Sequence, residues 1–317
     1  MKILKSVLLV FCFFLQPSVF AQQTVIKDIT YKITPENDSV KLDLYFPTNH
    51  LFQKTPLVVF IHGGAWVEGN KDHESIYYMR SLRDTLRTRG YAIASINYRL
   101  VNKNTHLPAP VIDCKDAVRW IRAHAGDYNF DTENIGLWGG SAGAHLALLI
   151  GYTGDDFALG SQELQAYSTK VNYIVDNFGP TDLNKVLKTK ASPLTKLIYK
   201  CFFRQLYDIR EKLIIAMTSY DIKTDKKKAI EVAKAYSPIE FVTSNAVPTL
   251  IMHGTKDFVV PFKESKKLKK ALDQNNVDNK FVKVKKGDHG FNNISKDQLD
   301  ELIQETVEFI EQNYFEK

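Results

Sequence analysis

Two kinds of hydrophobic pattern alternate along most of this chain. Continuous apolar runs, typical of strands buried on both faces of a sheet, occupy residues 56–61, 91–96, 135–138, 171–177, 249–253 and 280–284. Between them, apolar residues at helical spacing mark segments at about residues 74–89, from Pro110 onward, and at residues 144–150, 261–273 and 296–313. Strands that alternate with helices predict an α/β fold with a mainly parallel sheet and helices on both faces.

Two regions depart from this alternation. Residues 24–33 and 41–46 alternate apolar and polar positions around a turn at residues 35–38, which predicts an antiparallel hairpin. With the six apolar runs, the hairpin gives an eight-stranded sheet in a single α/β-hydrolase domain of residues 22–317. Residues 181–247 contain no strong strand and many lysines, which predicts a helical insertion, or cap. The pattern leaves open whether this insertion shapes the substrate site or is a peripheral pair of helices.

The first 21 residues predict a secretory signal peptide outside the fold. Lys2 and Lys5 precede an apolar run at residues 7–15, and the small residue Ala21 stands before the expected cleavage point. The run is too short to cross a bilayer, so no integral membrane span is expected. The alternative, a buried N-terminal helix, lacks the amphipathic period that it needs. We therefore expect a mature chain that begins near Gln22 and is secreted or periplasmic.

Composition narrows the classes of partner. The 317 residues carry a net charge of +6 and are 44% hydrophobic, as in ordinary globular proteins. The lysines are scattered, without the arginine-rich arm or basic stripe of a nucleic-acid binder, so no nucleic-acid partner is expected. Cys114 and Cys201 lack metal-ligand spacing, and we interpret both as structural and unpaired. The eight histidines show no H-E-x-x-H or similar spacing, so neither a metal nor another cofactor is expected.

The strongest chemical signal is Gly139-Gly140-Ser141-Ala142-Gly143, which reads G-x-S-x-G. A short apolar strand precedes it and a helix rich in Ala and Leu follows it, which is the context of a nucleophile elbow. Small neighbours allow the serine to lie on a sharp turn, and the amides of the following helix point toward charge that develops beside Oγ. Such a motif also recurs by chance, but the flanking elements favour Ser141 as a nucleophile.

Ser141, Asp257 and His289 each follow a predicted strand. Functional groups of open α/β sheets gather at the carboxyl ends of strands, and the order Ser, Asp, His is the order of this fold. A serine needs a base, so we expect His289 to accept its proton and later to protonate the leaving group. We expect Asp257 to hold the imidazole tautomer. Taken singly, Asp257 also fits a turn and His289 a surface loop, and Asp288 competes for the acid role.

The loop His62-Gly63-Gly64-Ala65-Trp66 follows the first apolar run. Its two glycines allow the backbone to approach a substrate closely and to turn amides toward a developing oxyanion. The predicted oxyanion hole consists of the amides of Gly63, Gly64, Ala65 and, behind the serine, Ala142. We expect His62 to brace the loop. Trp66 is a candidate substrate-binding residue at the wall of the acyl pocket, although simple packing fits it slightly better.

With the Asn97-Tyr98-Arg99-Leu100 turn and residues 253–257, these motifs resemble those of α/β-hydrolase esterases. From about residue 26 to residue 315 the chain is similar to hormone-sensitive-lipase-like carboxylesterases and to bifunctional feruloyl/acetylxylan esterases. Ala65 and Trp66 stand where the lipase-like branch usually continues with a third glycine, which favours the feruloyl/acetylxylan branch. Kynurenine formamidases carry a similar H-G-G-x-W, but the secretion signal argues against that cytosolic reaction. The insertion after Pro180 is long for these families.

The resemblance implies a secreted serine ester hydrolase that uses a Ser-His-Asp triad and an acyl-enzyme. Its expected partner is a small-molecule or carbohydrate ester with a short acyl or feruloyl group. A serine amidase or peptidase is the alternative within this chemistry, although dipeptidyl-peptidase-like enzymes carry a large β-propeller ahead of the catalytic domain. A non-catalytic binding module on a hydrolase scaffold is the alternative from another class, but such proteins typically lose the serine or the histidine.

Overall fold

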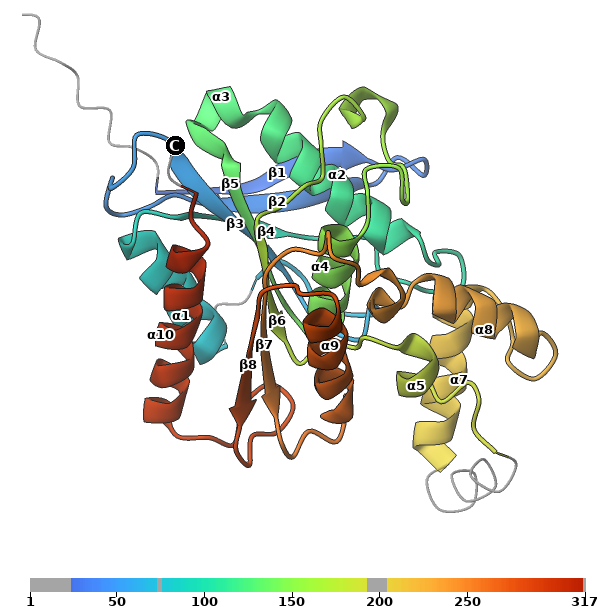
Figure 1. Cartoon of the computed structure of the whole chain (residues 1–317). Helices are drawn as coiled ribbons and strands as arrows, with labels where there is room; N and C mark the ends of the chain where they lie inside the picture. The colour runs from blue at the N-terminus through green and yellow to red at the C-terminus, as the bar shows by residue number, and fades with distance from the viewer. Residues whose placement is uncertain (1–23, 73–75, 193–203, 316–317) are drawn as a thin grey trace, which may run out of the picture.

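A computed structural model describes residues 24–72, 76–192 and 204–315 (Figure 1). The predicted signal peptide and Cys201 lie outside these residues. Within them, eight strands form one sheet in the order β1-β2-β4-β3-β5-β6-β7-β8. The strands are β1 (Val25–Ile33), β2 (Ser39–Tyr45), β3 (Thr55–Ile61), β4 (Ala92–Ile96), β5 (Phe130–Gly140), β6 (Tyr173–Asn177), β7 (Thr249–Gly254) and β8 (Asn279–Val284).

The sheet is antiparallel at one edge and parallel elsewhere. The pairs β1–β2 and β2–β4 are antiparallel, whereas every neighbouring pair from β4 to β8 is parallel. Both the N-terminal hairpin and the mainly parallel eight-stranded sheet are thereby confirmed. Every residue of β3, β4, β6 and β7 is buried, which explains their continuous apolar runs. β5 begins earlier than predicted, because Phe130 already pairs with Thr55.

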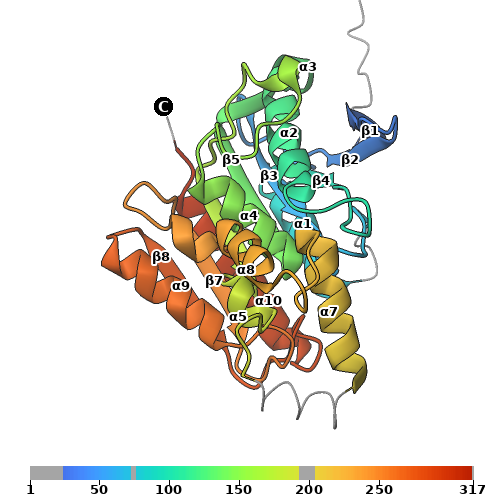
Figure 2. The same cartoon turned by 90° about the vertical axis from the view of Figure 1, so that its right-hand side faces the viewer.

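Helices cover both faces of the sheet (Figures 1 and 2). Outside the insertion they are α1 (Tyr77–Thr88), α2 (Ala109–Ala123), α3 (Ala125–Tyr128), α4 (Ala142–Tyr152), the 3-10 helix η1 (Gln162–Leu164), α9 (Lys263–Gln274) and α10 (Lys296–Gln312). α1 and α10 pack on one face, and α2, α4 and α9 pack on the other. Alternate residues of β3 supply the two cores: Val59 belongs to one and Val58 to the other.

The described part of residues 181–247 is helical. It contains α5 (Leu183–Val186), α7 (Arg204–Thr218), α8 (Lys226–Ala235) and the 3-10 helix η2 (Pro238–Phe241), which lie to one side of the sheet beyond α4 (Figure 1). The end of α7 is tied to the segment before α2, where the Leu107 amide donates to the Met217 carbonyl at 2.9 Å. His106 Nδ1 lies 2.8 Å from the Ala216 carbonyl. α7 therefore has a fixed position beside the strand ends.

Buried charges join the N-terminal hairpin to α2. Lys32 Nζ lies 2.9 Å from Asp113 and 2.7 Å from Asp116, and Arg99 binds Asp113 through two nitrogens. Charges that leave water need such partners, so removal of one carboxylate would destabilise the hairpin. Cys114, between the two aspartates, is buried and free. Among the described residues, no helix is long and apolar enough to cross a membrane.

Candidate active site

Ser141 lies on a strained turn between β5 and α4. Its backbone angles are φ 54° and ψ −118°, a conformation that a residue with a side chain adopts only when its surroundings enforce it. Two hydrogen bonds do so here: the Ser141 amide donates to the Asn177 carbonyl at 2.9 Å, and the Ser141 carbonyl accepts from the His145 amide at 3.0 Å. The turn therefore presents Oγ at the carboxyl end of β5.

The glycines of the elbow allow α4 to approach the sheet closely. A Cβ at Gly143 would lie 2.0 Å from the Ile61 carbonyl oxygen, and a Cβ at Gly139 would lie 2.4 Å from the carbonyl carbon of Gly143. Neither position has room for a side chain, because backbone atoms form the obstacle. The first and last glycines of the G-x-S-x-G motif are thus needed for the turn to close.

The structure brings the three residues predicted from strand ends into one hydrogen-bonded chain. Ser141 Oγ lies 3.0 Å from His289 Nε2, and His289 Nδ1 lies 2.7 Å from Asp257 Oδ2. Because an ionised carboxylate only accepts hydrogen bonds, the proton on His289 belongs on Nδ1 and leaves Nε2 free to accept the serine proton. Phe178 packs edge-on against the imidazole, with ring centroids 4.7 Å apart, and limits its rotation.

Asp257 is buried and fully hydrogen-bonded. Its Oδ1 accepts the amides of Val259 and Val260 at 2.8 and 2.9 Å, and its Oδ2 receives both His289 and His253 Nε2, the latter at 3.1 Å. Burial alone would raise the pKa of this carboxyl, but the hydrogen bonds from His253 and His289 outweigh it and hold the pKa below its usual range. Asp257 is therefore a permanent anion beneath His289.

His253 is a positioning residue that the sequence reasoning missed. Ser265 Oγ lies 2.6 Å from His253 Nδ1 and can donate to it, which leaves the His253 proton on Nε2, 3.0 Å from the Val260 carbonyl and 3.1 Å from Asp257 Oδ2. The signal was present in the sequence, since His253 ends a buried strand four residues before Asp257. Its hydrogen bond could not be deduced without the turn that folds Asp257 back onto β7.

Asp288, the sequence competitor for the acid role, turns away from the imidazole. Its Oδ1 accepts the Asn292 amide at 2.7 Å, and its own amide donates to Asn293 at 2.8 Å. These contacts shape the loop that carries His289. The structure thus places Asp257, and not Asp288, at Nδ1.

Three of the residues predicted for the oxyanion hole, Gly63, Gly64 and Ala65, lie in the loop after β3. The fourth, Ala142, begins α4 directly after Ser141. Gly64 has φ +110°, and Ala65 and Trp66 have φ 50° and 65°, so the loop is coiled in a left-handed conformation. Within residues 24–72, 76–192 and 204–315, the amides of Gly63, Gly64, Ala65 and Ala142 have no acceptor. Gly63 packs directly against the elbow, because a Cβ there would lie 2.9 Å from the Gly140 carbonyl oxygen.

Two buried histidines hold this loop. His62 stacks on Tyr98 with ring centroids 4.3 Å apart, and its Nδ1 lies 2.7 Å from the Gly63 carbonyl. The Trp66 indole donates to His145 Nδ1 at 3.1 Å, and His145 Nε2 reaches the Tyr236 carbonyl at 2.8 Å. Burial lowers the pKa of each histidine to about 4, so both are neutral near pH 7. The position of His62 fits the bracing role that the sequence suggested.

Trp66 lies in the core and not in the cavity. Its side chain is 3% exposed, and its indole nitrogen is occupied by His145. The substrate-binding role considered for Trp66 is therefore corrected to the packing alternative. The physical reason is the left-handed turn at Ala65 and Trp66, which directs the indole inward toward α4.

A cavity of about 410 Å³ opens beside Ser141. Its walls combine apolar side chains with polar ones that could bind hydroxyl groups, together with the backbone of the oxyanion loop. The lining residues are Phe60, His62, Gly63, Gly64, Glu68, Gly69, Asn70, Asp72, Ile76, Met79, Gly140, Ser141, Phe178, Gly290 and Asn292. Among the described residues, no group of three or more His, Cys, Asp or Glu side chains is arranged to hold a metal ion.

Comparison with known proteins gives matches over most of the chain. Residues 42–272 match the BD-FAE family. Esterase LipC of Mycobacterium tuberculosis (strain ATCC 25618 / H37Rv) is 27% identical over 231 residues, which are 73% of this chain and 51% of that protein. The probable isoprenylcysteine alpha-carbonyl methylesterase ICMEL1 of Arabidopsis thaliana is 25% identical over 261 residues, 80% of this chain and 48% of that protein. The chain thus spans about half the length of these curated relatives.

Solved structures with the same fold include esterases. A truncated carbohydrate esterase from gut microbiota superposes with a TM-score of 0.68 at 24% identity and covers 91% of this chain and 97% of that chain. Est2 of Thermogutta terrifontis with bound propionate gives a TM-score of 0.67 at 24% identity, with coverages of 90% and 93%. The predicted α/β-hydrolase fold and the resemblance to α/β-hydrolase esterases are confirmed.

Proposed function

Because the chain belongs to the BD-FAE family, we propose that it is a serine ester hydrolase in which Ser141 is the nucleophile. The observation that carries the proposal is the continuous chain from Ser141 Oγ to His289 Nε2 at 3.0 Å and from His289 Nδ1 to Asp257 Oδ2 at 2.7 Å. Three relatives support it by name: Esterase LipC, Esterase LipQ and Probable carboxylic ester hydrolase LipM.

In the proposed reaction, Ser141 Oγ attacks the carbonyl carbon of an ester while its proton passes to His289 Nε2. The carbonyl oxygen becomes an oxyanion, and the unoccupied amides of Gly63, Gly64, Ala65 and Ala142 are the donors available to it. When the tetrahedral intermediate collapses, the C–O bond to the alcohol breaks and His289 gives its proton to the departing alkoxide. The resulting acyl-enzyme is then hydrolysed by a water molecule, from which His289 takes a proton.

Asp257 serves this cycle through charge and orientation. Each turnover converts His289 into a cation twice, and the anionic carboxylate 2.7 Å from Nδ1 stabilises that cation. The depressed pKa of Asp257 keeps the carboxylate ionised throughout the pH range in which His289 can act as a base. The same contact fixes the tautomer that leaves Nε2 as an acceptor.

For the substrate, we propose an ester whose alcohol half is a carbohydrate and whose acyl half is short or feruloyl-like. The cavity beside Ser141 supports a hydroxyl-rich alcohol, since the polar residues Glu68, Asn70 and Asn292 line it. We also propose that the protein is secreted or periplasmic, on the basis of the leader-like composition of residues 1–21. N-terminal sequencing of protein from the extracytoplasmic fraction tests the second proposal, with Gln22 as the expected first residue.

Substitution Ser141→Ala tests the reaction. We expect hydrolysis of p-nitrophenyl acetate to fall by a factor of about 10⁴ or more, with an unchanged circular dichroism spectrum and melting temperature. A fluorophosphonate should modify Ser141 of the wild type and leave the variant unlabelled. The exposed Ser244 provides the matched control, and Ser244→Ala should retain full activity. Retained hydrolysis by Ser141→Ala would reject the assignment, and faster cleavage of the matched p-nitroanilide would indicate an amidase.

A further inference from the structure

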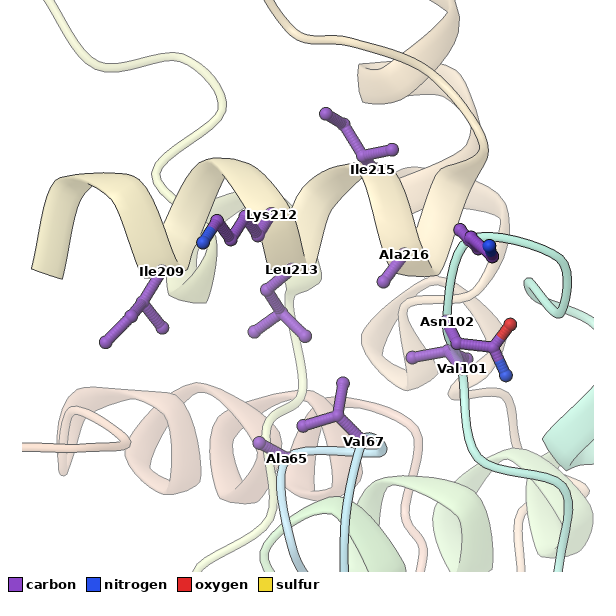
Figure 3. A pocket seen from close by; sticks show the side chains of 10 residues that line it. Ala65, Val67, Val101, Asn102, Ile209, Lys212, Leu213, Ile215 and Ala216 are labelled. Carbon is purple, nitrogen blue, oxygen red and sulfur yellow. The ribbon is translucent and has the colours of Figure 1, made fainter. Parts of the chain in front are cut away.

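A second cavity lies between α7 and the oxyanion loop of residues 62–67 (Figure 3). We call it the α7 pocket; its volume is about 450 Å³. In Figure 3, Leu213 and Ala216 point from α7 toward Ala65 and Val67 of the loop. The lining residues are Ala65, Val67, Val101, Asn102, Lys103, Ile209, Lys212, Leu213, Ile215 and Ala216. The helical insertion and the oxyanion loop thus build this pocket together.

The walls of the α7 pocket are apolar and partly open to water. Val67 is 43% exposed and Ile209 is 59% exposed, so each leaves a large apolar surface in solvent. Covering such surface with an apolar ligand is favourable, and concave apolar pockets of roughly 300–1,000 Å³ are typical of ligand sites in proteins. Lys103 and Lys212 are the charged residues of the lining; both are exposed and lie at its rim. The chemistry of the pocket therefore fits an apolar group, whereas the walls of the cavity beside Ser141 mix apolar and polar side chains.

The proton transfers of the proposed reaction decide which half of an ester faces each cavity. His289 must protonate the departing alkoxide, so the alcohol half has to leave on the side of the His289 loop. Gly290 and Asn292 of that loop line the cavity beside Ser141, and no residue of the loop lines the α7 pocket. The two cavities meet at the oxyanion loop, because Gly64 lines the cavity beside Ser141 and the next residue, Ala65, lines the α7 pocket.

We infer that the α7 pocket receives the acyl half of the substrate, and that this half is the longer of the two kinds proposed above, an extended apolar group and not a short acyl group. The inference rests on the proposed ester hydrolysis and specifies its substrate class. An acetyl group ends at the oxyanion hole, whereas a chain of six to eight carbons extends past Ala65 to Val67, Leu213 and Ala216. These three side chains are then determinants of acyl specificity, and they do not take part in the chemical step.

A series of p-nitrophenyl esters from acetate to octanoate tests the inference, because the leaving group stays constant. For the wild type, kcat/KM should rise by about fourfold for each methylene that the pocket buries. Ala216→Trp fills the pocket and should flatten this rise, lowering kcat/KM for the octanoate at least tenfold. Its acetate activity should stay within twofold of wild type, which also shows that the variant is folded. A parallel loss on both esters, or an unchanged series, would overturn the inference.

A matched pair of variants tests the polarity of the pocket. Ile209→Ser places a hydroxyl at an exposed lining position, and Leu159→Ser makes the same change at a leucine that is 55% exposed and lines neither cavity. Only Ile209→Ser should reduce the preference for octanoate over acetate, by about threefold to tenfold. An equal effect of both substitutions would show that the preference does not come from the α7 pocket.

A series of alkyl acetates with alcohols of increasing length tests whether the α7 pocket binds the acyl half or the alcohol half of the ester. If Ala216→Trp flattens this alcohol series and spares the acyl series, the α7 pocket holds the alcohol half and the inference is wrong. Failure of the underlying reaction has a different signature. In that case the wild type hydrolyses neither acetate nor octanoate, and a fluorophosphonate does not label Ser141.

Discussion

Two buried aspartates lie at the carboxyl ends of neighbouring strands, one within β6 and one on the turn after β7, and they differ in almost every contact. Asp257 follows β7, and its two oxygens together accept two amides and two histidines. Asp176 lies in β6, where its Oδ1 accepts the Gly179 amide at 2.7 Å and its Oδ2 has no partner among the described residues. The hydrogen bonds hold the pKa of Asp257 below its usual range, whereas burial raises the pKa of Asp176 to about 6.

The difference shows that hydrogen-bond donors, and not depth, decide what a buried carboxyl can do. Both carboxyl groups are shielded from water, so desolvation disfavours the charge on each. Two amides of the turn after β7, together with His253, surround the Asp257 carboxylate. These hydrogen-bond donors keep Asp257 anionic. Asp176 receives one donor and gains a proton easily. Only the first of these environments can stabilise an imidazolium ion.

Asp257→Asn should have the largest effect of the substitutions that test this contrast. The amides of Val259 and Val260 would hold the Asn oxygen at the place of Oδ1, so its NH₂ group would face His289 Nδ1. The imidazole proton would then move to Nε2, which could no longer accept the serine proton. We expect kcat for p-nitrophenyl acetate to fall by about 10⁴ with little change in KM.

Asp288→Asn is the matched control for this substitution. Asp288 is adjacent to His289 in sequence, but its Oδ1 accepts the Asn292 amide, and an asparagine can accept the same bond. Its kcat should stay within about twofold of wild type. If Asp288→Asn were the more damaging change, the acid that serves His289 would be Asp288.

The residues at the strand ends could be predicted from sequence because local patterns determine them. The G-x-S-x-G motif between an apolar strand and an apolar helix identifies Ser141, and the positions of Asp257 and His289 after strands follow from the alternation of elements. The sheet order could not be deduced, but any parallel arrangement brings these strand ends to one edge. The family resemblance and the α/β-hydrolase fold were correct for this reason.

Contacts made by tertiary packing were beyond the sequence. His253 and Asp176 are ordinary strand residues in the sequence. Only the folded structure shows that the turn after β7 brings Asp257 back to His253 and that Asp176 Oδ2 has no partner among the described residues. The sequence left two roles for Trp66, substrate binding and packing. The left-handed turn that buries its indole is formed by Ala65 and Trp66, and such a turn cannot be predicted where neither residue is a glycine. The helical character of residues 181–247 was predicted, but not that α7 lies across the oxyanion loop.

Asp176→Asn should have the next largest effect, and on stability. A pKa of about 6 in the folded protein, against an ordinary value of 3.8, corresponds to about 3 kcal/mol of stability. The folded protein binds the additional proton between about pH 4 and pH 6, so the Asp176 contribution to unfolding free energy falls as the pH rises through this window. Below it both states are protonated, and above it both are ionised.

Urea unfolding at pH 4, 5, 6 and 7 measures this contribution. Relative to wild type, Asp176→Asn should gain about 2 kcal/mol in going from pH 4 to pH 7, because asparagine does not titrate. Asp38→Asn, at an exposed position, should shift the wild-type curve by the same small amount at each pH. Parallel curves for Asp176→Asn and wild type would mean that Asp176 titrates normally in the folded protein.

His253→Phe should have the smallest effect, because it removes one of the four donors that distinguish Asp257 from Asp176. The phenyl ring can keep the edge-on contact with Phe262, whose ring centroid lies 5.5 Å from that of His253. The phenyl ring cannot donate a hydrogen bond to Asp257 Oδ2. The ionised carboxylate therefore loses a stabilising contact, which raises the pKa of Asp257 toward that of Asp176. A hydrogen bond to a charged group contributes about 1.5–3 kcal/mol, and the remaining bonds from His289, Val259 and Val260 limit the loss. We expect a decrease of about tenfold in kcat at unchanged KM, since His253 does not line the cavity beside Ser141.

His253→Gln, whose amide can still donate, should recover most of the activity. If Gln and Phe were equally impaired, His253 would act through packing alone, and the contrast between the two aspartates would depend on the backbone amides after β7.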